Sequence, residues 1–130
     1  AKKIKLTKKN LELYPVVIRN QNNELIFHHR VNEAIWHNLY EFPHLDSHLE
    51  EIEELFSHNS AKIIHIEELP QFKHVLTHIN FEIHPTVIIV ESHQPTLHFK
   101  GKEYQWINQS KYQSFAKTKP TNDILGTLML

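Results

Sequence analysis

The segment Ile35-Trp36-His37-Asn38-Leu39-Tyr40-Glu41-Phe42-Pro43 gathers three large aromatic rings into one short stretch of chain. Aromatic side chains each bury about 150–250 Å², so we expect this segment to anchor the core. Pro43 has no amide hydrogen and ends any regular element that precedes it. A strand pattern lies before the segment and a helix pattern lies after it, which makes it the junction of the fold.

The residues before the junction predict a β-hairpin. Residues 11–19 are rich in Leu, Val, Ile and Tyr, and residues 24–30 form a second apolar run. Between them, Asn-Gln-Asn-Asn at 20–23 favours a turn, because asparagine tolerates left-handed backbone conformations. Alternation along the second strand places Leu25 and Phe27 on one face.

After the junction we expect a helix that begins at Ser47, where Ser47 and Glu50 have the spacing of a capping box. Its apolar stripe consists of Leu49, Ile52, Leu55 and Phe56. Its acidic residues are Glu50, Glu51, Glu53 and Glu54. We interpret these acids as solvated residues that suit the helix dipole, not as metal ligands.

The rest of the chain predicts further strands and two short helices. We expect strands at 61–67, 74–84, 87–90, 97–99 and 104–107. Asn108 is the predicted cap of a helix through Lys111 and Phe115, and Thr121 that of a closing helix. This closing helix should bury Ile124, Leu125 and Leu128. The sum is about six strands in one mixed sheet packed between helices.

Composition limits the function classes. The chain has 130 residues, typical of one domain, and 40% of them are hydrophobic. It has no cysteine, which excludes disulfides, thiolate metal sites and iron–sulfur clusters within these residues. No apolar run is long enough to span a membrane and no signal-peptide pattern is present, so we expect a cytoplasmic protein. The net charge of −1 means that any contact with DNA must be local or assisted.

The N-terminal residues suggest a segment joined to more protein. The chain begins Ala1-Lys2-Lys3 without an initiator methionine, so we expect a fragment of a longer or processed protein. Residues 1–10 carry five lysines, and we interpret them as the end of a linker or a basic arm. The folded domain is then expected to cover residues 11–130.

No constellation of residues predicts catalysis or a metal site. Among the twelve histidines, the pairs His74/His78 and His44/His48 have four-residue spacing but no third ligand nearby in sequence. No serine stands in a glycine-flanked nucleophile elbow. Two isolated glycines, Gly101 and Gly126, exclude a glycine-rich phosphate loop. We therefore predict no catalytic residue and no metal ligand in this chain.

The order strand, loop, helix resembles the Nudix hydrolases, whose motif glutamates hold magnesium against a pyrophosphate. The chain departs from that motif, because no glycine occurs between Pro43 and Gly101 and the only arginines are Arg19 and Arg30. It thus resembles an α/β (α+β) Nudix-like scaffold without the catalytic motif.

Four segments also resemble the C-terminal, Nudix-like domain of the MutY family of adenine DNA glycosylases. They are residues 25–43 with the Leu-Tyr-Glu-Phe-Pro sequence, residues 74–78 (His-Val-Leu-Thr-His), residues 104–107 (Tyr-Gln-Trp-Ile) and residues 120–130. In that family a separate N-terminal helical domain, with an iron–sulfur cluster, removes adenine mispaired with 8-oxoguanine. The C-terminal domain recognises the oxidised base through a Phe-Ser-His loop, whose places are taken here by Leu76, Thr77 and His78.

The resemblance implies a module for DNA repair by base excision that binds double-stranded DNA carrying 8-oxoguanine opposite adenine, together with the catalytic domain. It implies no cofactor and no activity in this chain alone. Oxidation turns guanine N7 from a hydrogen-bond acceptor into a donor, and the Thr77 hydroxyl is suited to accept from it. Two alternatives remain open: a divergent Nudix nucleotide pyrophosphohydrolase, and a Nudix-like protein-binding module.

Overall fold

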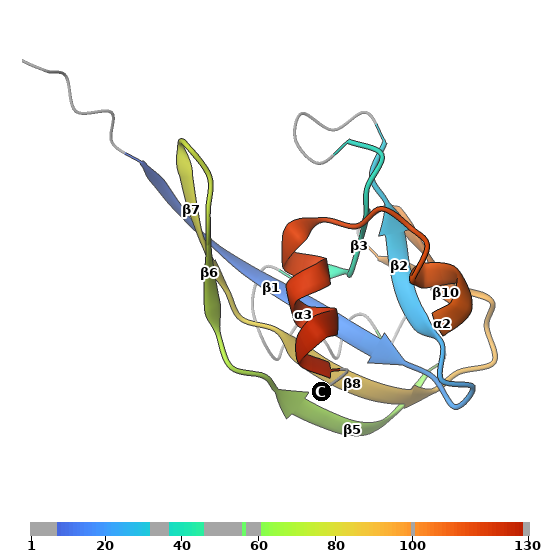
Figure 1. The fold of residues 1–130 in the computed structure, drawn as a ribbon. Coiled ribbons are helices and arrows are strands. Elements are labelled where there is room, and N and C mark those ends of the chain that lie inside the picture. The colour runs from blue at the N-terminus through green and yellow to red at the C-terminus, as the bar shows by residue number, and fades with distance from the viewer. Residues whose placement is uncertain (1–7, 32–36, 46–55, 57–60, 100, 129–130) are drawn as a thin grey trace, which may run out of the picture.

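The structure, a computed structural model, describes residues 8–31, 37–45, 56, 61–99 and 101–128. The predicted helix from Ser47 and the Trp36 side chain lie outside this part of the chain, except for Phe56. The described residues form ten strands and two helices (Figure 1). The strands are β1 (Lys9–Arg19), β2 (Leu25–His29), β3 (Tyr40–Glu41), β4 (His44–Leu45), β5 (Lys62–Glu68), β6 (Phe72–Val75), β7 (Ile79–Ile83), β8 (Thr86–Glu91), β9 (Thr96–Phe99) and β10 (Lys102–Ile107). The helices are α2 (Gln109–Tyr112) and α3 (Lys119–Leu128).

Strand β1 is the central strand of a mixed sheet. Its first half pairs in parallel with β7, with Leu11 opposite Phe81, and its second half pairs in parallel with β8, with Val17 opposite Val87. Strand β2 returns antiparallel to β1, and β10 and β9 follow beside it. The predicted hairpin is confirmed, and its turn places Asn23 at a φ of 58°.

Three strands form a projection that we call the arm, made of β6, β7 and residues 9–13 of β1. Figure 1 shows the arm leaving the body of the sheet toward the N-terminal end of β1. Strand β6 pairs antiparallel with β7, and β7 pairs in parallel with β1. Since Lys9 and Asn10 are already paired with β7, the sheet begins two residues before the predicted domain boundary at 11.

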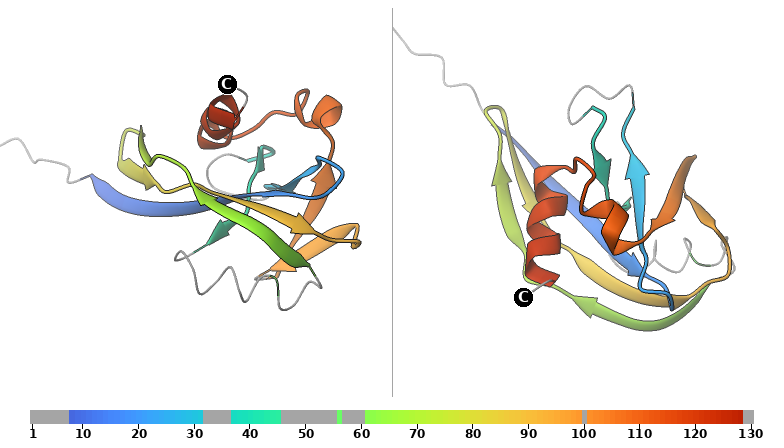
Figure 2. Two further views of the ribbon diagram at one scale, coloured as in Figure 1. Left: turned by 90° about the horizontal axis from the view of Figure 1, so that it is seen from below. Right: turned by 45° about the vertical axis from the view of Figure 1, so that its right-hand side comes forward.

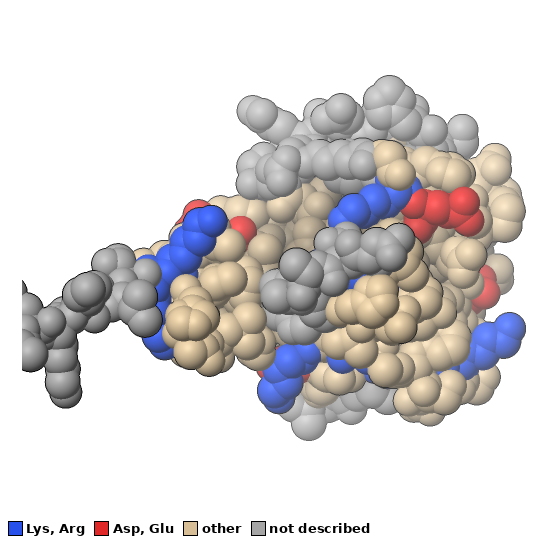
Figure 3. All heavy atoms as spheres, turned by 90° about the horizontal axis from the view of Figure 1, so that it is seen from above, with Lys and Arg blue, Asp and Glu red and all other residues tan. Residues whose placement is uncertain are grey.

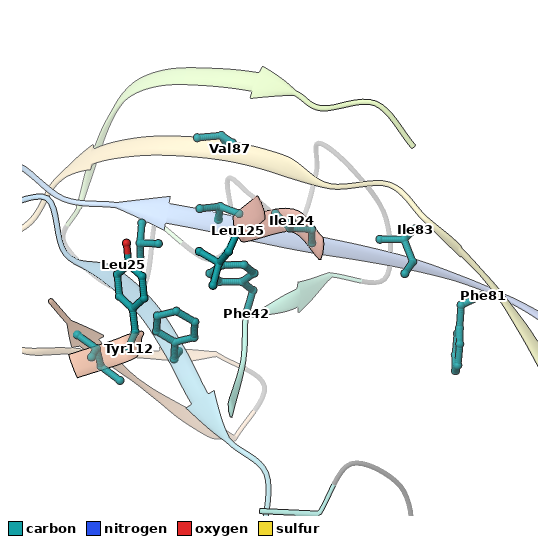
Figure 4. Close-up of a cluster of buried hydrophobic side chains, with 11 residues drawn as sticks. Leu25, Phe42, Phe81, Ile83, Val87, Tyr112, Ile124 and Leu125 are labelled. Carbon is teal, nitrogen blue, oxygen red and sulfur yellow. The ribbon is translucent and has the colours of Figure 1, made fainter. Parts of the chain in front are cut away.

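Both faces of the sheet are covered, which explains the continuous apolar runs in its strands. Alternate residues of β1 take part in different clusters: Val16 and Ile18 point to one face and Val17 to the other. The first face also buries Phe56, which is helical. The second face packs against α2 and α3 (Figure 2). In Figure 4 the side chains of Ile124 and Leu125 from α3 point into this second cluster.

The Tyr-Glu-Phe part of the junction segment is confirmed as an anchor. Phe42 is fully buried and its ring stacks on Phe27 at 5.0 Å between centroids. Tyr40 stacks on Phe115 at 4.4 Å, and its backbone carbonyl accepts from Thr118 N at 3.1 Å. The segment therefore joins β2 on one side to the α2–α3 connection on the other.

Glu41 completes the anchor with a buried ion pair. The Arg30 guanidinium Nη1 donates to both carboxylate oxygens of Glu41 at 2.9 Å. His44 Nε2 lies 3.2 Å from the same carboxylate. Burial alone would raise the pKa of Glu41, but the hydrogen bond and charge of His44 and the Arg30 guanidinium outweigh it and lower the pKa. The carboxylate is thus ionised in the core near neutral pH.

The structure corrects several predictions. The alternating run 74–84 is two strands, because a turn at 76–78 separates β6 from β7. His74 lies in β6 and His78 in the turn, so their four-residue spacing does not place them on one face of a strand. The structure has ten strands where about six were predicted, because the run 74–84 is two strands and the two-residue strands β3 and β4 were not predicted; the predicted strand at 97–99 is confirmed as β9.

The helices are correct in place but differ in their ends. Asn108 caps α2 as predicted, accepting from Lys111 N at 3.1 Å, but the helix ends at Tyr112, before Phe115. Helix α3 begins at Lys119, so the predicted cap Thr121 is wrong. Thr118 precedes the helix instead, and its hydroxyl accepts from Thr121 N at 3.4 Å. Leu128 is 38% exposed, not buried.

Neither helix in the described part of the chain has the length together with the apolar character that crossing a lipid bilayer requires.

Candidate nucleic-acid interface

The three predicted site residues form the turn at the tip of the arm. Leu76 N donates to Ile79 O at 2.8 Å, which closes a tight turn over residues 76–79. The carbonyl of His78 accepts from Lys9 N at 3.0 Å. The turn is therefore fixed at its base by β1 as well as by its own strands, and it is presented at one end of the molecule.

The three side chains have different surroundings. Thr77 and His78 are both exposed residues of this turn. Leu76 is half-buried and packs against the second core cluster. Leu76 therefore has a packing role in the structure, which reduces its freedom to wedge or stack on a base.

Two lysines lie at the tip of the arm. Lys8 and Lys9 are exposed at the same end as the turn, while Glu12 and Glu82 lie closer to the body. Figure 3 shows basic side chains on the arm, with acidic ones beside them. Lysine ammonium groups near a phosphate backbone favour binding through release of counterions. The tip of the arm has this character, although the whole chain is nearly neutral.

A group of side chains that the sequence did not predict lies where the arm joins the body of the sheet. The ligand atoms of Glu12, Glu82 and His84 all lie within 4.8 Å of one another. Glu12 and Glu82 are opposite each other in the parallel ladder between β1 and β7. They are 70 positions apart in the sequence, so no local spacing could have identified them; only the pairing of β1 with β7 brings them together.

A cavity of about 620 Å³ lies between the sheet and helices α2 and α3. Its polar lining includes Arg19, His65 and Glu67, and its apolar lining includes Leu25 and Tyr112. A volume of this size is in the range of small-molecule sites. The cavity is separate from the arm and was not expected from the sequence.

Comparison with known proteins identifies the fold. The family model described as the NUDIX domain matches residues 14–127. A search of curated proteins gives no match.

Solved structures agree with that family. The C-terminal domain of mouse MUTYH, determined in complex with human PCNA, has a TM-score of 0.71 at 12% identity over 91% of this chain and 86% of that chain. The NUDIX domain of Shewanella oneidensis NrtR, determined with ADP ribose, has a TM-score of 0.69 at 10% identity over 98% and 92%. A NUDIX hydrolase from Nitrosomonas europaea has a TM-score of 0.61 at 12% identity over 92% and 87%. At these identities the likeness is one of fold.

Proposed function

The chain belongs to the NUDIX domain family, and from this premise we propose that it is the C-terminal lesion-recognition domain of an adenine DNA glycosylase. It binds the strand that carries 8-oxoguanine opposite adenine, and it works with a catalytic domain elsewhere in its parent protein. The observation that carries the proposal is the exposed position of Thr77, a residue with a hydroxyl group, in the turn of the arm. The iron–sulfur cluster and the catalytic acid then belong to that other domain, not to this chain.

The chemistry of the turn fits an oxidised guanine. Ordinary guanine presents an acceptor at N7 in the major groove, whereas 8-oxoguanine presents N7–H and an extra oxygen at C8. A hydroxyl such as that of Thr77 can accept from N7–H and donate to a neighbouring oxygen. An unmatched polar contact with ordinary guanine costs about 1–3 kcal/mol. The exposed Lys8 and Lys9 supply attraction to phosphate that does not depend on sequence.

The chain has the fold of the family but lacks the catalytic motif of the Nudix hydrolases. This supports lesion recognition, and not nucleotide hydrolysis, as its function. The chain has no glycine between Pro43 and Gly101, and its only arginines are Arg19 and Arg30. Arg30 is committed to the buried pair with Glu41. The chain therefore supplies neither the glycines of the hydrolase motif nor an arginine at the position that the motif requires.

Thr77→Val tests the proposal, because it removes the hydroxyl while keeping a branched side chain of similar size. We expect preference for 8-oxoguanine over guanine in duplex binding, measured by fluorescence anisotropy at low salt, to fall by roughly 5- to 150-fold, the equivalent of about 1–3 kcal/mol. Thr127→Val is the matched control, because Thr127 is an exposed threonine on α3, outside the arm. Equal preference in Thr77→Val and in the parent chain would contradict the proposal.

Nucleotide hydrolysis is the alternative, and the cavity beside α2 and α3 is the observation that favours it. Incubation with 8-oxo-dGTP, dGTP or ADP ribose in the presence of Mg²⁺ decides between the two. We expect no phosphate or pyrophosphate release above background. Steady turnover that is lost in Glu67→Gln, a change in the cavity lining, would replace lesion recognition by hydrolysis.

A further inference from the structure

The parallel register of β1 and β7 sets two carboxylates side by side. Glu12 is the direct partner of Glu82, and the backbone N of His84 donates to Leu13 O at 2.8 Å, which fixes His84 beside the same strand. Like charges directly opposite each other in a sheet are destabilising. The arrangement therefore favours a cation between these strands.

The ligand atoms lie close to coordination distances. His84 Nε2 is 3.6 Å from Glu12 Oε1, and all three ligand atoms are within 4.8 Å of one another. Two ligands bonded tetrahedrally to zinc at about 2.0–2.2 Å are about 3.3–3.6 Å apart. His84 and Glu12 already have this separation, and side-chain rotations that move a ligand atom by about 1 Å close the rest of the set.

Tyr14 holds two of these side chains in place. Its hydroxyl donates to Glu12 Oε2 at 3.1 Å, and its ring stacks on the His84 ring at 4.9 Å between centroids. Such outer contacts orient metal ligands and fix the imidazole ring. The His84 side chain is 17% exposed and that of Glu12 is 57% exposed, so the group is supported from the protein side and open to solvent on the other.

We propose that Glu12, Glu82 and His84 bind one divalent transition-metal ion of the zinc class. The imidazole favours zinc, cobalt, nickel or copper over Mg²⁺ and Ca²⁺, which prefer oxygen ligands. Three protein ligands leave a position for water, as in open zinc sites. The ion would tie β1 to β7 at the base of the arm, below the turn that contains Thr77.

Lys73 provides the competing way to neutralise the two acids. It is the β6 partner of Glu82 and it is exposed. If the Lys73 ammonium group alone neutralised the two carboxylates, no metal ion would be required to balance their charge. Lys73→Met keeps all three ligands and removes this competitor, so the proposal expects zinc binding to persist or tighten in this variant.

Calorimetric titration of the chain with ZnCl₂, with MgCl₂ as a parallel titration, tests the site. We expect one zinc equivalent to bind tightly and Mg²⁺ not to compete with it. Glu12→Gln, Glu82→Gln and His84→Phe should each weaken this binding by at least about tenfold, because even the loss of an outer-shell partner costs 10–100-fold. His84→Phe keeps an aromatic ring next to Tyr14.

Two controls separate this site from the other histidines. His93→Gln and Glu68→Gln change exposed residues outside the arm and should leave zinc binding unchanged. Nitrogen-15 spectra of the unaltered chain should show the first zinc equivalent shifting the His84 ring signals, which does not depend on any variant folding. Unchanged zinc affinity in Glu82→Gln, loss of zinc binding in Lys73→Met, first shifts at other histidines, or no zinc binding at all would overturn the proposal. None of these results depends on DNA binding.

Discussion

Glu41→Gln should destabilise the fold by about 3 kcal/mol at pH 7. The substitution keeps the shape of the side chain but removes the charge that faces Arg30 and His44. The Glu41 side chain is 3% exposed and that of Arg30 is 13% exposed, so the pair is almost dry. Breaking a buried pair by removing one partner costs about 3–5 kcal/mol. The lower end applies because the glutamine oxygen still accepts one hydrogen bond and Arg30 keeps some contact with water.

The pH dependence of this loss gives a second, independent signature. The folded-state pKa of Glu41 is lowered from its ordinary value of 4.5. A carboxylate with a lowered pKa stabilises the folded state above its unfolded pKa and loses that contribution as the pH falls through the folded pKa. The difference in unfolding free energy between the parent chain and Glu41→Gln should therefore be largest above about pH 5 and shrink as the pH falls below that range.

Urea unfolding followed by circular dichroism at several pH values measures both effects. A loss of about 3 kcal/mol corresponds to a fall in Tm of roughly 10–15 °C for a domain of this size. Asp123→Asn is the control, because the Lys119–Asp123 pair at 2.8 Å has side chains that are 66% and 37% exposed. Exposed pairs contribute about 0.2–1 kcal/mol. A loss below 1 kcal/mol for Glu41→Gln, or a difference that does not change with pH, would refute the reasoning.

Two further predictions concern the scaffold. Phe42→Ala should cost about 3–5 kcal/mol in urea unfolding, because Phe42 is fully buried against Phe27 and the truncation leaves a cavity in the core; a loss under 1 kcal/mol would show that the junction segment is not an anchor. Asn108→Ala should cost about 1 kcal/mol, since it removes the side chain that caps α2, while Asn108→Asp should keep nearly all of the stability; equal losses in both variants would contradict the capping role.

Much of the fold follows from patterns that are local in the sequence. The runs around Val17, Leu25 and Val87 predicted strands, and all three residues lie in one core cluster of the sheet. The junction segment was predicted to anchor the core because it concentrates large aromatic side chains, each of which buries a large apolar surface. Asn108 was recognisable as a cap because its side chain acts on its own helix.

The parts that could not be predicted depend on contacts between distant residues. The turn at Leu76-Thr77-His78 has no glycine, proline or asparagine to mark it, and its base is fixed by Lys9 of another strand. The start of helix α3 is an exception, because Pro120 in its first turn is a local signal that favours a start before Thr121. The proposed metal site of Glu12, Glu82 and His84 depends on the pairing of Glu12 in β1 with Glu82 in β7, which are far apart in the sequence.

The most direct test of lesion recognition is a chemical-shift titration of the nitrogen-15-labelled chain with two duplexes, one carrying 8-oxoguanine opposite adenine and one carrying guanine. The account predicts that amide signals of residues 76–78 and of Lys9 move most, and that they move more with the oxidised duplex. Equal shifts with both duplexes, or shifts confined to the cavity residues Arg19, His65 and Glu67, would contradict it.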